Sequence, residues 1–272
     1  MQSTNSEIAI DVICPVFNHA EYIEECLLSI LNQEGLIVIV HVVDDASNDA
    51  TLEIVKVIQN KYPGQIKIYA NKTRVGNAIE SIALNKIRLT ANYWAYIEGD
   101  DFLVNSKKFI MQISRLEEVP ELIATATQCM LWKVEQNTKV ILKPDLVRWN
   151  FKDLITKKNQ YSMYCHISSL VWKSETRNNS EVFFPESSES EVYLVHLLLK
   201  NSKKYIEFQD IEGSCYRYTG KGIWSSLDED RQKIVNYQVE LAIDSITPIW
   251  FKIQRTMAPG IVKFRARITG RI

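Results

Sequence analysis

Short apolar runs rich in β-branched residues alternate with amphipathic stretches near the N-terminus, and this alternation limits the fold more than any other feature. Residues 8–14 and 36–43 are almost continuously apolar, as strands buried on both faces of a parallel sheet are. The segment between them has helical apolar spacing, and we expect Asn18 to cap this helix with Glu21 as its partner. The chain therefore begins with a predicted β-α-β unit.

The same alternation continues through the first hundred residues. The pattern predicts a helix over 49–61, a strand over 66–70, a helix over 76–89 and a strand over 93–97. Strands that alternate with helices in this way are typical of a wound, mainly parallel sheet flanked by helices. We therefore predict an α/β fold of the Rossmann-like kind.

After residue 100 the alternation is less regular. We expect a helix over 105–118, strands over 122–134 and 139–142, and a helix over 229–247. No stretch rich in Gly, Pro or Ser separates two domains. We therefore predict one domain over 7–230, followed by a C-terminal helix and tail over 231–272.

Composition and charge exclude several classes of function. The chain has 272 residues and a formal net charge of -1, so it has no overall basic field for nucleic acid. Its five cysteines form no CxxC pair, which argues against a disulfide framework and a zinc finger. We see neither a signal peptide nor an apolar run long enough to span a membrane. These features predict a cytoplasmic protein.

The tail over 250–272 differs in charge from the rest of the chain. It holds six Lys and Arg residues and no acidic residue, so it carries +6 and leaves -7 on residues 1–249. Apolar and basic residues are interleaved there, which is typical of an anchor at an anionic membrane surface. Packing of the tail on its own domain, or binding of a partner chain, fits the same pattern. Peripheral contact with the inner face of the membrane is therefore one of three interpretations.

Two acidic clusters follow predicted strands. Asp44 and Asp45 end the second strand, and Glu98, Asp100 and Asp101 follow the fourth. Because parallel strands end at one edge of the sheet, we expect these carboxylates to surround one pocket and to bind Mg²⁺ or Mn²⁺ together with a phosphorylated substrate. The alternative is structural: the first pair would cap a helix, and the second cluster would be a polar turn.

Other nucleotide-binding signatures are absent. No GxGxxG follows the first strand, and the segment 213–221 has the wrong spacing for a P-loop. Three other segments, in their order and spacing, resemble glycosyltransferase family 2, whose members have the GT-A fold. These segments are Pro15-Val16-Phe17-Asn18, Val43 to Asp49, and Ile97 to Phe102.

The resemblance extends over about residues 7–230. Residues 165–173, 188–199 and 216–225 resemble the acceptor-side segments of the family. The resemblance implies a nucleotide-sugar-binding half over 1–101 and an acceptor-side half over 102–230.

The resemblance also implies roles for individual residues. It places Asp45 at the nucleotide base, Asp101 at the metal ion, and Glu98 with Asp100 beside the ribose and diphosphate. Asp100 is also a candidate metal ligand, and a positive charge at the diphosphate is expected from Arg74 or Lys72. The full set of implied donor-binding residues is Pro15, Phe17, Asn18, Asp45, Arg74, Asp100 and Arg217.

The general base is expected at the start of a helix. The resemblance points to Glu191, with Glu189 as the second candidate. Ser188 and Glu191 also have the spacing of a capping box, so a purely structural role for Glu191 stays open. We interpret His166 and His196 as structural residues, because a lone histidine is more often structural than a ligand.

The activity that the resemblance implies is inverting, metal-dependent transfer of a sugar to a saccharide hydroxyl. The donor would be a nucleoside-diphosphate sugar, with UDP as the expected nucleotide. The acceptor would be a saccharide or a lipid-linked saccharide, in polysaccharide or glycan assembly. The alternative is a catalytically silent nucleotide-sugar or glycan-binding module of the same fold. The sequence does not determine the donor sugar, the linkage or the oligomeric state.

Overall fold

The computed structural model describes residues 7–76, 87–156, 165–178, 191–220 and 228–248. Most of the predicted helix over 76–89 lies outside these residues, as do Glu189 and the basic tail over 250–272.

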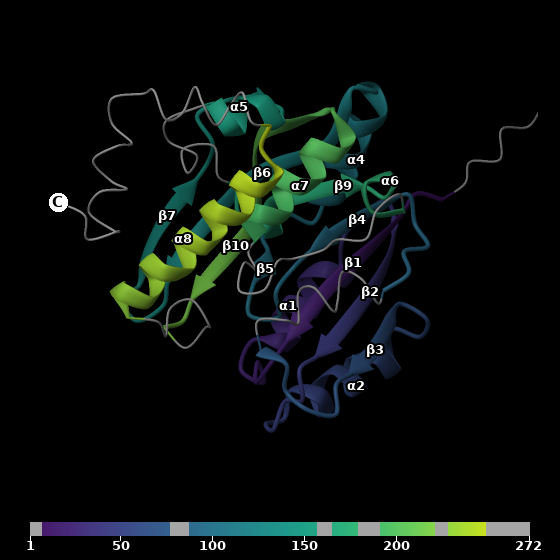
Figure 1. The fold of residues 1–272 in the computed structure, drawn as a ribbon. Coiled ribbons are helices and arrows are strands. Elements are labelled where there is room, and N and C mark those ends of the chain that lie inside the picture. The colour runs from purple at the N-terminus through teal and green to yellow at the C-terminus, as the bar shows by residue number, and fades with distance from the viewer. Residues whose placement is uncertain (1–6, 77–86, 157–164, 179–190, 221–227, 249–272) are drawn as a thin grey trace, which may run out of the picture.

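The first part of the chain forms four parallel strands and two described helices (Figure 1). The strands lie side by side in the order β3-β2-β1-β4, and each neighbouring pair is parallel. The predicted β-α-β unit is therefore confirmed. The elements are β1 (Ala9–Val16), α1 (Ile23–Leu31), β2 (Ile37–Asp44), α2 (Thr51–Lys61), β3 (Ile66–Ala70) and β4 (Tyr93–Tyr96).

The second part extends the same sheet with mixed pairing. β9 joins the two parts, because it pairs antiparallel with both β4 and β6. β10 then pairs parallel with β6 and antiparallel with β5 and β8, while β7 pairs with β6. The elements are β5 (Phe102–Leu103), α4 (Lys108–Glu118), β6 (Leu122–Lys133), β7 (Thr138–Leu142), β8 (Arg148–Trp149), α5 (Phe151–Thr156), the 3₁₀ helix η3 (Ile167–Ser169), β9 (Leu170–Lys173), α6 (Glu175–Asn178), α7 (Glu191–Ser202), β10 (Tyr205–Tyr218) and α8 (Glu229–Ile246).

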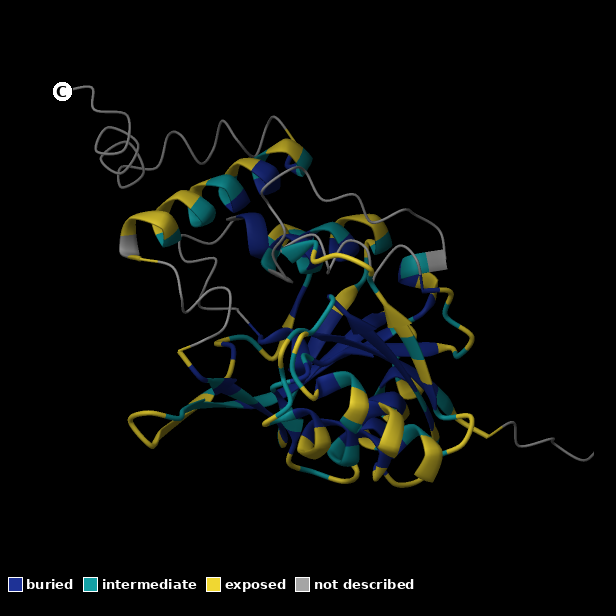
Figure 2. Cartoon of the chain, turned by 90° about the horizontal axis from the view of Figure 1, so that it is seen from below, coloured by how far each residue is buried: buried dark blue, intermediate teal, exposed yellow. Residues whose placement is uncertain are grey.

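Helices cover both faces of the sheet. α1, α2 and α4 bury their apolar side chains in a core on one face, and α5, α7 and α8 bury theirs in a core on the other. Figure 2 shows the sheet buried between helices whose outer surfaces are exposed. The predicted wound α/β fold is confirmed, and the predicted strand and helix ends within the described residues agree with the observed ones to within three residues.

The predicted cap of the first helix is wrong. α1 begins at Ile23, and no side chain caps it. The side chain of Asn18 instead accepts a hydrogen bond from the backbone N–H of Asn48 at 2.9 Å, and Asn18 has a φ of 55°. The side-chain amide therefore connects two loops, because its oxygen accepts the N–H of Asn48 and not an N–H of the first turn of α1.

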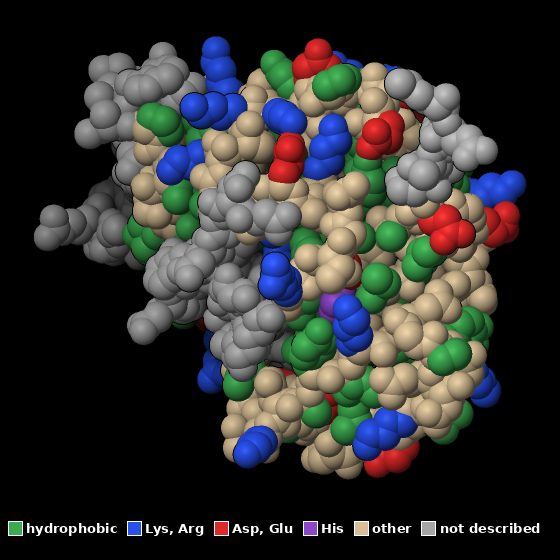
Figure 3. All heavy atoms as spheres, turned by 90° about the vertical axis from the view of Figure 1, so that its right-hand side faces the viewer, with side chains coloured by type: hydrophobic (Ala, Val, Ile, Leu, Met, Phe, Trp, Pro, Cys, Tyr) green, Lys and Arg blue, Asp and Glu red, His purple; other side chains and the backbone are tan. Residues whose placement is uncertain are grey.

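The described surface is mixed in charge. On the face in Figure 3, positive and negative side chains are interspersed with apolar ones. Among the described residues, no helix is both long and apolar enough to cross a membrane. All five cysteines are buried free thiols, as the absence of a paired pattern predicts.

Candidate active site

Both acidic turns lie at the carboxyl edge of the parallel strands. The N–H of Asp45 donates to the carbonyl of Val16 at 2.9 Å, and the N–H of Gly99 donates to the carbonyl of Pro15 at 3.0 Å. The end of β1 is therefore held between the turn after β2 and the turn after β4. This is the arrangement that parallel strand ends predict.

Asp45 is 2% exposed and fixes the segment after β3. Its carboxylate accepts hydrogen bonds from the N–H groups of Val75 and Gly76, both at 2.8 Å, and from the side chain of Asn71 at 3.1 Å. Charge-assisted hydrogen bonds of this kind are among the stronger ones in proteins. Asp45 therefore holds residues 71–76 at the edge of the sheet.

Neither Asp44 nor Asp45 caps α2, so the structural alternative for this pair is wrong. Asp44 accepts a hydrogen bond from the N–H of Ser47 at 3.1 Å, within the loop. The N–H of Thr51, the first residue of α2, donates instead to the carboxylate of Asp49 at 3.0 Å.

Two predicted donor-binding residues contact each other beside Asp45. The guanidinium of Arg74 lies over the ring of Phe17, 4.0 Å from its centroid. A cation held this close to an aromatic face is stabilised by the ring quadrupole. The adjacent loop is also fixed, because the N–H of Asn18 donates to Ser47 Oγ at 3.0 Å. The structure therefore brings Phe17, Arg74 and Asp45 to one place.

The turn over 98–101 requires a glycine. A Cβ on Gly99 would lie 2.5 Å from Val16 Cγ1 and 2.7 Å from His19 Nδ1, which is closer than real Cβ atoms approach. The side chain of Asp100 points toward His19, with 3.9 Å between its Oδ2 and His19 Nε2. The close packing fixes the direction in which the acidic side chains leave this turn.

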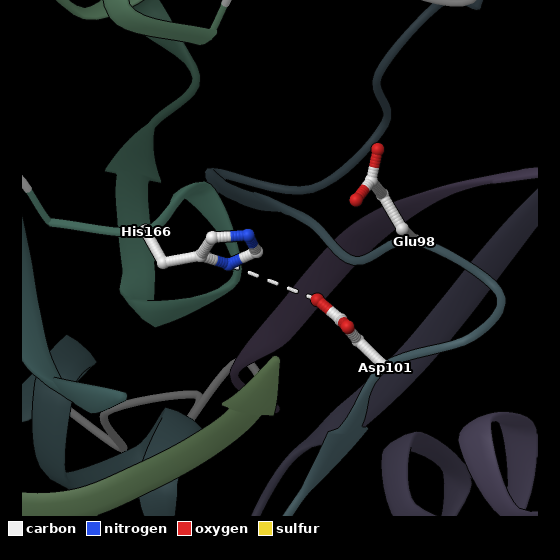
Figure 4. A group of neighbouring side chains, drawn as sticks. All are labelled: Glu98, Asp101 and His166. Carbon is white, nitrogen blue, oxygen red and sulfur yellow. Dashed lines mark ion pairs between the residues drawn. The ribbon is translucent and has the colours of Figure 1, made fainter. Parts of the chain in front are cut away.

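Glu98, Asp101 and His166 form the one group of acidic, cysteine or histidine side chains among the described residues that could hold a metal ion. We call it the carboxylate–imidazole group. Its ligand atoms all lie within 4.8 Å of one another, and His166 Nδ1 is 3.7 Å from Asp101 Oδ2 (Figure 4). Oxygen and imidazole donors fit Mg²⁺ or Mn²⁺. Asp100 is outside this group, and its role as a metal ligand stays a prediction.

His166 is 3% exposed and lies in a polar environment. Burial lowers the pKa of His166 to about 3, so the imidazole is neutral at neutral pH, which is the form that binds metals. The sequence interpretation of His166 as a purely structural residue missed its proximity to Asp101. No spacing signal could have revealed it, because the two residues meet only through the antiparallel pairing of β9.

Arg217 supports the acidic turn from β10. Its N–H donates to Asp101 Oδ1 at 3.0 Å, and its guanidinium donates to the carbonyl of Asp100 at 2.9 Å and to Glu25 Oε2 at 2.5 Å. The side chain is only 3% exposed and lies against the rings of Tyr22, Phe102 and Trp132. What the contacts establish is bracing of the turn, and contact with a diphosphate stays a prediction.

The candidate base lies at the start of a helix, as expected. α7 begins at Glu191. The side chain of Glu191 and the whole of Glu189 lie outside the described part of the structure. The choice between catalysis and helix capping at Glu191 therefore stays open.

Comparison with known proteins identifies the family. The model of glycosyl transferase family 2 matches residues 11–173, which is more than half of the chain and includes both acidic turns and His166. The chain belongs to glycosyltransferase family 2. The carboxylate–imidazole group therefore lies within the segment that matches the family.

Curated bacterial relatives are also glycosyltransferases. The chain is 26% identical over 180 residues to the abequosyltransferase RfbV of Salmonella typhimurium, covering 61% of this chain and 53% of that protein. It is 32% identical over 99 residues to an uncharacterised glycosyltransferase of Haemophilus influenzae, covering 36% of this chain and 38% of that protein. The chain thus spans about half or less of these two relatives, so their whole activities do not carry over to it.

Solved structures show the same fold. S. aureus TarS in complex with UDP-GlcNAc superposes with a TM-score of 0.63 at 17% identity, covering 86% of this chain and 66% of that chain. The mannosyltransferase PcManGT from Pyrobaculum calidifontis, in complex with GDP-Man and Mn²⁺, gives a TM-score of 0.57 at 15% identity, covering 96% of this chain and 79% of that chain. The predicted GT-A fold is thereby confirmed.

Proposed function

We propose that this family 2 glycosyltransferase is an inverting, metal-dependent enzyme that moves a sugar from a nucleoside-diphosphate sugar to a saccharide hydroxyl. The observation that carries the proposal is the carboxylate–imidazole group at the same sheet edge as Asp45. The similar structures bind UDP-GlcNAc, or GDP-Man with Mn²⁺, which supports a nucleotide-sugar donor and a divalent cation. Our preferred donor nucleotide is UDP, and our preferred setting is polysaccharide or glycan assembly.

Glu98, Asp101 and His166 would hold Mg²⁺ or Mn²⁺, with Asp100 as a further ligand from the same turn. When bound, the cation would stabilise the negative charge that develops on the leaving diphosphate. The buried Asp101 already has a backbone donor in Arg217, so its carboxylate is held in place before any ligand arrives. The donor set therefore fits the cation.

The remaining donor contacts follow the strand ends. We propose that Asp45 recognises the nucleotide base, with Pro15, Phe17 and Asn18 beside it. Arg74, held over Phe17, would place its charge toward the diphosphate. Arg217, which lies on the β10 side of the acidic turn, would contact the diphosphate from that side.

A base must remove the proton of the acceptor hydroxyl as that oxygen attacks the anomeric carbon. We propose Glu191 for this step, with Glu189 as the second candidate. Attack from the side opposite the diphosphate inverts the anomeric configuration. The rival function is a catalytically silent module that binds a nucleotide sugar or glycan without transfer.

One experiment separates the two. Nucleotide sugars are first screened by thermal shift with Mn²⁺, and the donor found is then assayed for hydrolysis and for transfer to saccharides. We expect turnover that Glu191→Gln lowers by about 10²–10⁴-fold while donor binding is kept. Glu189→Gln tests the second candidate and should have a much smaller effect. Donor binding without any turnover would favour the silent module, and a loss of thermal stability with normal turnover in Glu191→Gln would favour the capping role.

We further propose that residues 7–230 form the transferase domain, with halves over 1–101 and 102–230, and that 231–272 adds a C-terminal helix, which packs on the core through Val239, Ala242 and Ile243, and a basic tail. The tail over 250–272 would contact the inner face of an anionic membrane and bring a lipid-linked acceptor within reach. A truncation after Pro248 should lose salt-sensitive sedimentation with anionic liposomes but keep activity on a soluble acceptor. Full-length protein that ignores the liposomes would contradict the membrane contact.

A further inference from the structure

Two adjacent residues of β10 contact two members of the carboxylate–imidazole group. The ring of Tyr216 stacks on the imidazole of His166, with 4.2 Å between the ring centroids and 18° between the planes. The next residue, Arg217, donates its N–H to Asp101. Two residues before Tyr216, and on the same face of the strand, lies Ser214, which is 1% exposed.

Ser214 reaches His166 through a second hydroxyl. Ser168 Oγ donates to Ser214 Oγ at 3.1 Å and lies 2.7 Å from His166 Nδ1. A hydroxyl has one proton, so the proton given to Ser214 leaves Ser168 Oγ as the acceptor for an Nδ1–H donor. The N–H of Ser168 points at the same nitrogen from 3.4 Å and would donate to it only in the other tautomer, so the assignment of Nδ1–H rests on the shorter contact with Ser168 Oγ. In this arrangement Nδ1, which also lies 3.7 Å from Asp101 Oδ2, carries the proton, and Nε2 is the nitrogen whose lone pair would bind a cation.

A β-bulge sets the position of these residues on β10. The register between β10 and β6 shifts between Glu212 and Ser214. Gly213 occupies the bulge, where a Cβ would lie only 1.8 Å from Thr127 Oγ1. Bulges next to active sites commonly redirect the side chains that follow them. Here the bulge directs Ser214 toward Ser168, and the strand alternation then places Tyr216 against His166.

We propose that Ser168 and Ser214 are positioning residues that fix the tautomer and direction of His166 in the carboxylate–imidazole group. The proposal rests on the proposed function, because it requires that this group binds a divalent cation. Ser168 and Ser214 are at most 1% exposed and His166 is 3% exposed, so solvent does not readily replace either hydroxyl. Stacking on Tyr216 restrains the tilt of the ring but does not select which nitrogen carries the proton.

Ser169 provides a matched control. It lies in the same 3₁₀ helix and is equally buried, but its Oγ donates to the backbone carbonyl of His166 at 2.7 Å. Its removal therefore tests the local backbone without touching the imidazole. The probe is Mn²⁺, titrated into the full chain without nucleotide and with saturating UDP. The signal of free Mn²⁺ is followed by electron paramagnetic resonance.

We expect Ser168→Ala to weaken Mn²⁺ binding by about 10–100-fold, the usual effect of removing the partner of a ligating histidine. Ser214→Ala should weaken it several-fold, Ser168→Thr should restore most of the affinity, and Ser169→Ala should change it by less than about twofold. In the wild type, the ¹⁵N shifts of His166 should show the Nδ1–H tautomer.

Four outcomes would each overturn one part of the proposal. A folded Ser168→Ala variant with wild-type Mn²⁺ affinity overturns the positioning role. If that variant does not fold, an Nε2–H tautomer in the wild type, or unchanged affinity in Ser214→Ala, overturns it instead. Wild-type protein that binds no Mn²⁺ in either titration contradicts the metal site of the proposed function itself.

Discussion

The two parts of the sheet contribute to the site in different ways. In the parallel part, β1, β2 and β4 end at one edge, and the acidic side chains of the candidate site lie at or just after the ends of β2 and β4. In the mixed part, β9 and β10 pass beside that edge and contribute His166 and Arg217 from positions within or near the strands. The parallel part therefore supplies the acidic side chains, and the mixed part holds them in place. The difference shows why one part is easier to read from the sequence than the other.

The largest effect should follow from loss of the Asp101 carboxylate. Asp101 follows β4 of the parallel part and contacts His166 and Arg217 from the mixed part. Asp101→Asn keeps an oxygen for the N–H of Arg217 but removes the charge that a cation needs. We expect activity to fall by about 10³-fold, measured as transfer with saturating Mn²⁺. Asp210→Asn is the control, because Asp210 is an exposed residue bonded to Gln128 and lies outside the carboxylate–imidazole group. Equal activities in the two variants would remove Asp101 from the site.

A second test compares one glycine from each part. Gly99→Ala and Gly213→Ala both place a Cβ within 2.6 Å of a neighbouring side-chain atom, so we expect each to lower the free energy of unfolding by about 3 kcal/mol. Gly64→Ala has no neighbour within 4 Å and only a positive φ of 82°, so it should cost about 1 kcal/mol. Urea unfolding measures all three. If Gly213→Ala costs no more than Gly64→Ala, the tight bulge is not required.

A third test concerns a buried cation in the mixed part. Lys108, at the start of α4, is 0% exposed, and its Nζ has no hydrogen-bond partner among the described residues. Burial lowers the pKa of Lys108 to about 7 from 10.5. Below pH 7 the folded protein carries this buried charge with the centroid of the Phe109 ring 4.8 Å from Nζ but with no hydrogen-bond partner among the described residues, so Lys108→Met should raise the free energy of unfolding by roughly 2 kcal/mol at pH 6.

The difference in stability between the wild type and Lys108→Met should depend on pH. Between pH 7 and pH 10.5 the unfolded chain binds more protons at this lysine than the folded chain does, so the stability of the wild type rises with pH. The advantage of Lys108→Met should therefore shrink over that range. A constant difference between the two proteins from pH 6 to pH 10 would show that Lys108 is not neutral in the fold.

The smallest effects should come from the contacts of the Arg217 guanidinium. Arg217→Lys keeps the backbone N–H to Asp101 and loses these contacts. If Arg217 braces the turn, we expect kcat and Mn²⁺ affinity to fall by about tenfold with little change in the donor KM. Glu25→Gln, which weakens the same contact from an exposed residue, should have a smaller effect. A rise in donor KM alone would indicate a direct contact with the diphosphate.

The sequence predicted the parallel part well because its signals are local. Continuous apolar runs located β1 and β2, and carboxylates after strand ends located Asp45 and Asp101 at one edge. The mixed part depends on pairings between distant segments, and a bulge at Gly213 changes its register. For that reason His166 was interpreted as structural, and the bracing by Arg217 was not foreseen. The local capping pattern at Asn18 gave a wrong prediction, because the Asn18 side chain accepts a hydrogen bond from the N–H of Asn48 and does not cap the helix.

The most direct test of the central claim is the position of a bound cation. Crystals would be grown with Mn²⁺ and the nucleoside diphosphate that gives the largest thermal shift, and anomalous scattering would be measured at the manganese edge. The account predicts an anomalous peak between Glu98, Asp101 and His166, beside the nucleotide phosphates. A peak elsewhere, such as at Asp44, or a bound nucleotide with no peak at the carboxylate–imidazole group, would contradict it.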